Sequence, residues 1–166
     1  MIKSETRANI LLVDDIPANL LALEAVLERL GQNLVKVVSG EDVVKHIIQK
    51  DFAVILLDIR MPGINGFETA ALIRQNDRSR NTPIIFLTAL QKGEMEMSES
   101  YAVGVLDYMV KPFDPAELRS KVSVLIGIYH KMEKCRLLNE ELNRKIEELR
   151  VLNLSLMDEI EMSKRT

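Results

Sequence analysis

The stretch Ala53-Val54-Ile55-Leu56-Leu57-Asp58 decides how this sequence folds, because an unbroken apolar run ends on a carboxylate. A run of this length without polar alternation is typical of a strand that is covered on both faces in a parallel sheet. Three further runs have the same form and also lead into polar side chains. They are Asn9 to Val13 before Asp14 and Asp15, Pro83 to Leu87 before Thr88, and Asp107 to Val110 before Lys111.

Helical patterns separate these apolar runs along the chain. The expected helices are Pro17 to Leu30, closed by Gly31; Gly40 to Lys50, opened by Ser39; Phe67 to Gln75; and Gly93 to Val103, closed by Gly104. A weaker strand is expected from Leu34 to Val38. Strands that alternate with helices predict right-handed βαβ units and an α/β fold with a doubly wound parallel sheet. Ligands bind such sheets at the carboxyl ends of the strands.

The polar residues that end the runs should therefore meet at one edge of the sheet. Asp14, Asp15 and Asp58 would lie there with the hydroxyl of Thr88 and the ammonium of Lys111. Carboxylates about 5 Å apart repel one another by roughly 3 kcal/mol per pair at an effective dielectric near 20. Mg²⁺ removes that repulsion and prefers oxygen ligands. The set suits binding Mg²⁺ and moving a phosphoryl group onto an aspartate.

The segment from about Ala8 to Ile126 resembles the receiver domain of response regulators in two-component signalling. The resemblance rests on the acidic pair Asp14-Asp15, the turn Asp58-Ile59-Arg60-Met61-Pro62-Gly63, Gly66, Thr88-Ala89, Tyr108 and Lys111-Pro112-Phe113. It implies a flavodoxin-like sheet of five parallel strands in the order 2-1-3-4-5. It also implies a phosphorylation switch whose partner is a histidine kinase or a phosphotransfer protein.

The same resemblance implies a role for each acidic residue. Asp58 would be the phosphoacceptor, and Mg²⁺ would be the cofactor of the reaction. Asp15, Asp58 and the backbone carbonyl of Arg60 would bind the metal directly, whereas Asp14 would act through water.

The remaining site residues would sense the phosphoryl group. Lys111 would pair with it and would precede a cis bond to Pro112. Thr88 would turn its hydroxyl toward the phosphoryl oxygens, and Tyr108 would be the aromatic residue that swings inward when Thr88 moves. The change would then pass through the fourth helix, the fifth strand and the fifth helix.

The pattern changes after Phe113. Asp114-Pro115-Ala116-Glu117 is a strong helix start, with Asp as the cap, Pro in the first turn and Glu reaching back. A heptad pattern in the following residues predicts a coiled coil. Its a positions are Leu125, Met132, Asn139, Ile146, Asn153 and Ile160, and its d positions are Ile128, Cys135, Leu142, Leu149 and Leu156.

The coil should be a parallel homodimer, since Asn139 and Asn153 at a positions favour two strands. Lys145 would however face Arg150 of the partner helix, a like-charge pair. Leu138, Leu152 and Met157 widen the apolar face, so a larger bundle or packing against another domain stays open. We expect an N-terminal tail at 1–8, the receiver at 9–126 and a coiled-coil signalling helix at 127–166, with the output domain outside this sequence.

Composition excludes several other classes of protein. The chain has 166 residues, 47% of them apolar, and a net charge of −3, which gives no reason to expect nucleic-acid binding. The single cysteine fits a reducing cytoplasm. No apolar stretch approaches the roughly 20 residues that a membrane span needs, and the N-terminus lacks the apolar core of a signal peptide. We therefore expect a cytoplasmic location without membrane association.

Three other functions compete with the signalling switch. A phosphatase of the haloacid dehalogenase type needs a second Asp two residues after the nucleophile, but Arg60 stands there. A flavin-binding module would carry a phosphate loop after the first strand, where Asp14 and Asp15 would repel phosphate. A constitutive dimerisation scaffold with a vestigial site is the third. The chemistry expected here is phosphorylation and dephosphorylation of the chain itself, without another enzymatic activity.

Overall fold

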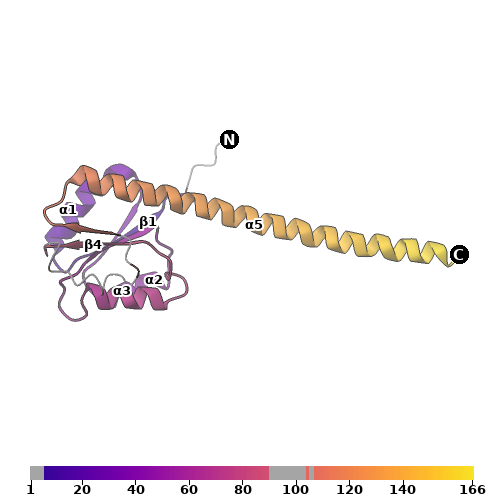
Figure 1. Cartoon of the computed structure of the whole chain (residues 1–166), viewed down its shortest axis with the longest axis horizontal. Helices are drawn as coiled ribbons and strands as arrows, with labels where there is room; N and C mark the ends of the chain where they lie inside the picture. The colour runs from indigo at the N-terminus through magenta and orange to yellow at the C-terminus, as the bar shows by residue number, and fades with distance from the viewer. Residues whose placement is uncertain (1–5, 90–103, 105–106) are drawn as a thin grey trace. The chain divides into compact units, whose positions relative to one another are not determined.

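The computed structural model describes residues 6–89, 104 and 107–166 (Figure 1). The chain divides into two compact units, Met1–Tyr129 and His130–Thr166. The helix predicted from Gly93 to Val103 lies outside the described residues.

The first unit contains a parallel sheet of five strands. They are β1 (Asn9–Val13), β2 (Asn33–Val37), β3 (Val54–Asp58), β4 (Ile84–Thr88) and β5 (Asp107–Val110). Their order is β2-β1-β3-β4-β5, so the predicted flavodoxin-like topology is confirmed. Strand β2 begins and ends one residue earlier than the sequence predicted.

The helices that follow β1, β2 and β3 begin and end at identifiable signals. Helix α1 (Pro17–Leu27) continues as a single 3-10 turn to Leu30, and Gly31 then adopts a left-handed φ of 67°. Helix α2 (Gly40–Ile47) is capped by the hydroxyl of Ser39, and α3 (Gly66–Gln75) by the carboxamide of Asn65. The prediction that the second helix reaches Lys50 was wrong, because α2 ends at Ile47 and the amide of Gln49 then donates to the carbonyl of His46, three residues back, as in a turn.

The sheet lies between helices on both of its faces (Figure 1), and an apolar layer packs on each face. Alternate residues of the central strands, such as Ile10 and Leu12, pack with α1 and the first part of α5. The intervening residues, such as Leu11 and Val13, pack with α2 and α3. Both faces of β1, β3 and β4 are thus buried, which is why these strands read as continuous apolar runs.

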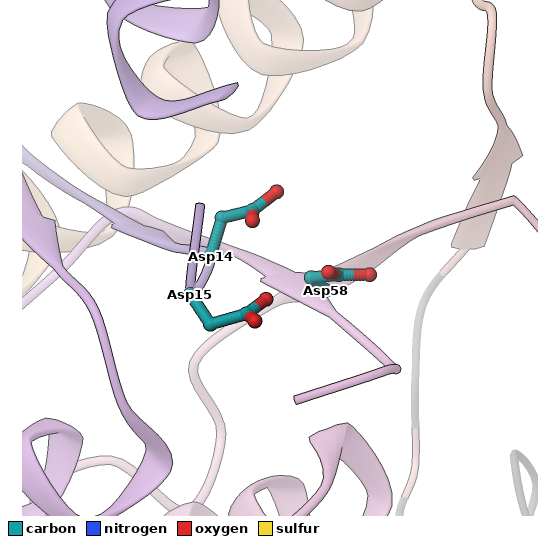
Figure 2. Close-up of side chains that lie close together, drawn as sticks. All are labelled: Asp14, Asp15 and Asp58. Carbon is teal, nitrogen blue, oxygen red and sulfur yellow. The ribbon is translucent and has the colours of Figure 1, made fainter. Parts of the chain in front are cut away.

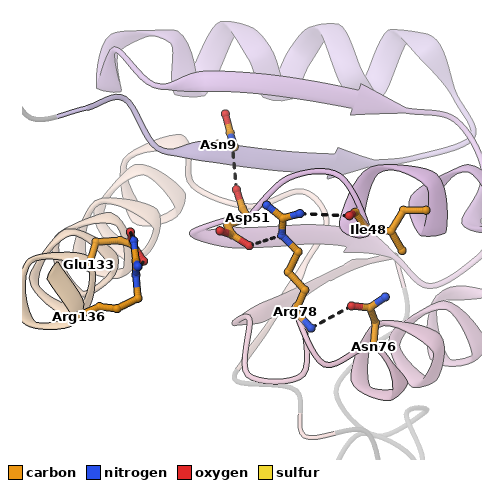
Figure 3. A network of polar contacts seen from close by, with 7 residues as sticks. All are labelled: Asn9, Ile48, Asp51, Asn76, Arg78, Glu133 and Arg136. Carbon is orange, nitrogen blue, oxygen red and sulfur yellow. Dashed lines mark hydrogen bonds and ion pairs between the residues drawn. The ribbon is translucent and has the colours of Figure 1, made fainter. Parts of the chain in front are cut away.

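Polar contacts link the loops at the amino ends of the strands (Figure 3). Arg78 donates from Nε to Asp51 Oδ1 at 2.6 Å and from a terminal nitrogen to the carbonyl of Ile48 at 3.1 Å. Asn9 Nδ2 donates to the carbonyl of Asp51 at 3.0 Å. These contacts join the α2–β3 loop to the α3–β4 loop at the end of the sheet opposite the acidic residues.

Helix α5 (Pro115–Lys164) is a single helix of 50 residues. Asp114 caps it, accepting a hydrogen bond from the amide of Ala116 at 2.9 Å. Glu117 contributes an ion pair to Lys121 at 3.5 Å. Leu125, the first a position of the predicted seam, is 8% exposed and belongs to the core of the first unit. The part of the seam that is open to other contacts therefore begins at Ile128.

The second unit consists of α5 from His130 onward. The apolar residues at its a and d positions have exposed fractions between 43% and 65%. They are Met132, Leu142, Ile146, Leu149, Leu156 and Ile160. Across residues 6–89, 104 and 107–166, no helix combines the length and apolarity that crossing a bilayer requires.

Gly66 is expected to tolerate no side chain, since a Cβ there would lie 2.5 Å from the carbonyl oxygen of Asp58 and 2.7 Å from Cα of Ile59. Gly66→Ala should lower the free energy of unfolding by about 1–3 kcal/mol through overpacking. Gly127→Ala is the matched control, because a Cβ there meets no atom within 4 Å. Alanine in that exposed helical position should add about 0.5–1 kcal/mol. Urea unfolding measures both, and equal effects of the same sign would contradict the assigned close approach.

Candidate functional site

Three carboxylates gather at the carboxyl ends of β1 and β3, as the sequence predicted. Val13 pairs with Leu57 in the sheet, so the residues that follow them, Asp14 and Asp58, lie side by side. One oxygen from each of Asp14, Asp15 and Asp58 falls within 4.8 Å of the others. Figure 2 shows the three side chains extending into the same region. Asp14 is 1% exposed and Asp58 7% exposed, whereas Asp15 is half-buried.

The carboxylate of Asp14 accepts hydrogen bonds from three residues. The amide of Ile16 donates to Oδ1 at 2.9 Å, and Lys111 Nζ donates to Oδ2 at 3.0 Å. Asn19 Nδ2 lies 3.0 Å from Oδ2 and 3.3 Å from Oδ1. Sequence reasoning missed Asn19. The sequence signal that could have found it is the short carboxamide side chain in the first turn of α1, only five residues after Asp14.

Lys111 lies between two of the carboxylates. Its Nζ is 3.0 Å from Asp14 Oδ2 and 3.9 Å from Asp58 Oδ1. The backbone fixes its position, because the amide of Lys111 donates to the carbonyl of Thr88 at 2.7 Å. The bond from Lys111 to Pro112 is cis, as the resemblance implied. The ammonium thus lies within ion-pair distance of both Asp14 and Asp58.

Thr88 and Tyr108 occupy neighbouring strands on one side of the sheet. Thr88 ends β4 and is 1% exposed. Tyr108 pairs with Phe86 across β4 and β5 and packs, partly buried, against the core layer that contains α2 and α3. Thr88 lies two residues after Phe86 in β4, and alternate residues of a strand point to the same face. Thr88 and Tyr108 therefore share this face of the sheet.

The turn after β3 shapes the space around Asp58. The amide of Arg60 donates a hydrogen bond to the Asp58 side chain, and the amide of Gly66 donates to the carbonyl of Ile59 at 2.8 Å. Ile59 and Met61 are buried, whereas the side chain of Arg60 is exposed. The metal-binding role of the Arg60 carbonyl stays a prediction.

Burial raises the pKa of Asp58 above its ordinary value. Lys111 opposes that rise, while the charges of Asp14 and Asp15 add to it, and the hydrogen bond from Arg60 lowers the pKa again. The net direction is upward, so ionised Asp58 is held in a surrounding that disfavours its charge. A cation placed among these oxygens would remove that penalty.

The donor set fits a hard divalent cation. All three side chains offer oxygen atoms, which are the ligands that Mg²⁺ prefers. Asp14 is already occupied by its hydrogen bonds, whereas no residue in the described ranges donates a hydrogen bond to the carboxylate of Asp15. Asp15 and Asp58 therefore have the oxygen atoms that a cation could bind directly, and Asp14 contributes negative charge beside them.

Comparison with known proteins gives one consistent result. The family model of the response regulator receiver domain matches residues 10–123. The transcriptional regulatory protein YvrH of Bacillus subtilis is 36% identical over 116 residues, which cover 69% of this chain and 47% of that protein. The protein PilH of Pseudomonas aeruginosa is 32% identical over 72% of this chain and 98% of its own length.

A solved structure extends the comparison to three dimensions. The receiver domain of the sensor histidine kinase PA1611 from Pseudomonas aeruginosa, solved with a magnesium ion in its active site cleft, superposes with a TM-score of 0.65. It is 35% identical, and the match covers 74% of this chain and 99% of that one. The chain spans about half the length of YvrH.

Replacing Asp58 by Asn should stabilise the metal-free protein at neutral pH. The raised pKa of Asp58 in the folded state means that its ionisation costs stability at every pH above that pKa. Asp58→Asn should therefore increase the free energy of unfolding at pH 7 by on the order of 1 kcal/mol, because the neutral amide avoids the cost of burying a charge and the repulsion from Asp14 and Asp15, while it loses the attraction of Lys111.

The advantage of Asp58→Asn should shrink as the pH falls through the folded-state pKa toward the unfolded value near 3.9, because wild-type Asp58 then becomes protonated. Urea unfolding with a chelator at several pH values measures the difference. A variant that is less stable than wild type at neutral pH would contradict the assigned electrostatics.

Proposed function

This chain belongs to the response regulator receiver domain family, and from that premise we propose that it is a switch in which Asp58 accepts a phosphoryl group. The donor is a histidine kinase or a phosphotransfer protein. One observation supports this more than any other: Lys111 lies within 3.9 Å of Asp58, in a site whose carboxylates lie within 4.8 Å of one another. A nucleophile, a charge-neutralising ammonium and a place for a cation are thus combined.

Asp58 performs the transfer as the nucleophile. A carboxylate oxygen of Asp58 attacks phosphorus in line, and the bond from phosphorus to the donor imidazole nitrogen breaks. The electron pair of that bond stays on the imidazole, which then takes a proton. Lys111 compensates the charge on the phosphoryl oxygens, which is most of what this reaction requires. The acyl phosphate product carries roughly −2 charge.

Mg²⁺ would be held by Asp15, Asp58 and the carbonyl of Arg60, with Asp14 acting through water. When bound, the ion supplies positive charge that offsets the phosphoryl oxygens and the clustered carboxylates. The PA1611 receiver domain, with magnesium in its cleft, supports the choice of ion.

Thr88 and Tyr108 form the readout of this switch. Thr88 ends β4, the strand beside β3. Asp58 pairs with Leu87 across these strands, so Thr88 comes one residue after the partner of the proposed phosphoacceptor. We expect the hydroxyl to turn toward the phosphoryl oxygens. Tyr108 packs on the same face of the sheet and would move inward into the space that Thr88 leaves. The β5 and α5 surface would change with it.

Residues 127–166 serve in this proposal as a signalling helix that pairs in parallel with a second copy. The exposed apolar side chains at the a and d positions of the second unit support the pairing, since a second helix would bury their apolar surface. Ion pairs within each helix reduce the expected repulsion between Lys145 of one helix and Arg150 of the other. Lys145 lies 3.7 Å from Glu141, and Arg150 lies 3.7 Å from Glu147. The coil would connect the receiver to an output domain.

Asp58 should be the sole phosphoacceptor. Incubation with Mg²⁺ and acetyl phosphate, or with beryllofluoride as a phosphoryl mimic, should give an adduct that mass spectrometry or fluorine NMR detects. Asp58→Asn should abolish the adduct, because the amide is not a nucleophile for phosphorus. An adduct that survives this substitution, or that forms equally well with a chelator present, would remove the site assignment.

Thr88→Ala is the companion variant that separates chemistry from readout. It should still form the adduct at Asp58, because Thr88 supplies no part of the nucleophile. Hydrogen exchange on residues 107–113 should respond to the adduct in wild type and stay unchanged in Thr88→Ala. A normal response in the variant would disprove the readout through Thr88.

Cys135 should report the geometry of the coil. In a parallel in-register dimer, a d position faces its own copy, and a disulfide needs Cα atoms about 4.4–6.8 Å apart. Cys135 is exposed and is the single cysteine of the chain. Mild oxidation should therefore give a disulfide-linked dimer, at a rate that beryllofluoride alters.

The matched control for Cys135 moves the thiol away from the seam. The double variant Cys135→Ser with Arg144→Cys places it at an f position, where two copies point apart, and should not cross-link. A dimer in solution that never cross-links through Cys135 would rule out the parallel register. A monomer at high concentration, measured by sedimentation, would rule out the coil.

A further inference from the structure

The side chain of Asn19 makes a specific contact that the phosphorylation mechanism does not use. Its Nδ2 bridges the two oxygens of Asp14, at 3.0 Å and 3.3 Å. A carboxylate only accepts hydrogen bonds, so the amino group of the carboxamide must face Asp14. Asn19 is half-buried in the first turn of α1, where its backbone N–H donates to the carbonyl of Ile16 at 3.0 Å.

The local backbone places Asn19 over Asp14. Helix α1 begins after Ile16, which offers no side-chain cap. Side chains in a helix lean toward its N-terminus, so the carboxamide reaches back across the β1–α1 turn. The amide of Ile16 donates to Asp14 as well. Asp14 and Asn19 together thus close the turn that a capping residue would otherwise close.

Asp14 accepts hydrogen bonds from three residues although it is 1% exposed. A buried carboxylate without partners is strongly unfavourable. Its partners are Ile16, Asn19 and Lys111, and the last of these is also the group that a phosphoryl on Asp58 would attract. Lys111 starts 3.0 Å from Asp14 and 3.9 Å from Asp58. Asp14 therefore competes with the phosphoryl group for the same ammonium.

We infer that Asn19 is a positioning residue that keeps Asp14 hydrogen-bonded when Lys111 leaves it for a phosphoryl group on Asp58. The inference rests on the proposed function and deepens it. Without Asn19, the amide of Ile16 would be the one protein hydrogen-bond donor left on Asp14 after Lys111 departs, so Asp14 would hold Lys111 more tightly. A neutral amide suits this role, since it satisfies Asp14 without cancelling the charge that a cation needs.

The test compares a phosphoryl mimic with the metal alone. Asn19→Leu keeps the size of the side chain and removes the donor. Calorimetric titration of the full chain with beryllofluoride at saturating Mg²⁺ should show a dissociation constant raised about tenfold, the scale of one hydrogen bond to a charged group. The dissociation constant for Mg²⁺ alone should change less than about threefold, because Lys111 does not have to leave Asp14 when only the metal binds.

Two further variants sharpen the test. Asn19→Gln keeps an amide donor and should recover part of the beryllofluoride affinity. Asn33→Ala removes an exposed amide at the opposite end of the sheet, where Asn33 donates to Asn9 at 3.2 Å, and should change neither constant. If Asn19→Leu does not fold, as judged by urea unfolding, Asn19→Ser takes its place, because its side chain is too short to bridge Asp14.

The outcomes separate this inference from the proposed function. Equal loss of Mg²⁺ and beryllofluoride affinity would make Asn19 a merely structural residue and overturn the inference, as would unchanged beryllofluoride affinity. If wild type itself binds no beryllofluoride at Asp58, the proposed function fails. If wild type binds beryllofluoride but Asn19→Leu does not weaken that binding more than it weakens Mg²⁺ binding, the proposed function stands and the role of Asn19 fails.

Discussion

The crowding of negative charge at one sheet edge is the constraint on which the rest of this structure depends. Three carboxylates lie within 4.8 Å of one another, and Asp14 and Asp58 are almost fully buried. Such a cluster persists only if hydrogen bonds and a nearby cation offset the repulsion. Asn19, the amide of Ile16 and Lys111 do this for Asp14, and Lys111 with the amide of Arg60 does so for Asp58. The site thus favours the binding of a further positive charge.

The sheet is what holds these charges together. Strands β1 and β3 are adjacent and in parallel register, so that Asp14 and Asp58 end neighbouring strands. Their apolar residues are buried on both faces, by α1 and α5 on one side and by α2 and α3 on the other. A one-residue slip in register would move every side chain of a strand to the wrong layer. The core therefore fixes the positions of the carboxylates more firmly than their own interactions could, and the close approach at Gly66 extends that precision to the turn after β3.

Helix α5 carries two different kinds of surface. Its first turns bury Leu118, Val122, Leu125 and Ile126 in the core of the receiver. Its later turns leave a row of apolar side chains exposed. An exposed apolar row along a long helix is stabilised by pairing with another helix. The proposed connection between phosphorylation and output lies in this sharing of one helix, because Tyr108 lies within β5 and Lys111 lies between β5 and the start of α5.

The sequence by itself determined the fold class, the strand order implied by the resemblance, and the set of residues at the sheet edge. The fold class and the residue set follow because continuous apolar runs, glycine stops and the ends of parallel strands are local features with one geometric consequence, whereas the strand order came from the family resemblance. It did not determine that Asn19 belongs to the site, that α2 ends at Ile47, or that Leu125 packs into the receiver core. Each of these depends on which side chain meets which across the packed molecule. Hydrogen bonds between residues on different elements and the burial of one face of a long helix are decided only when the tertiary structure brings those elements together.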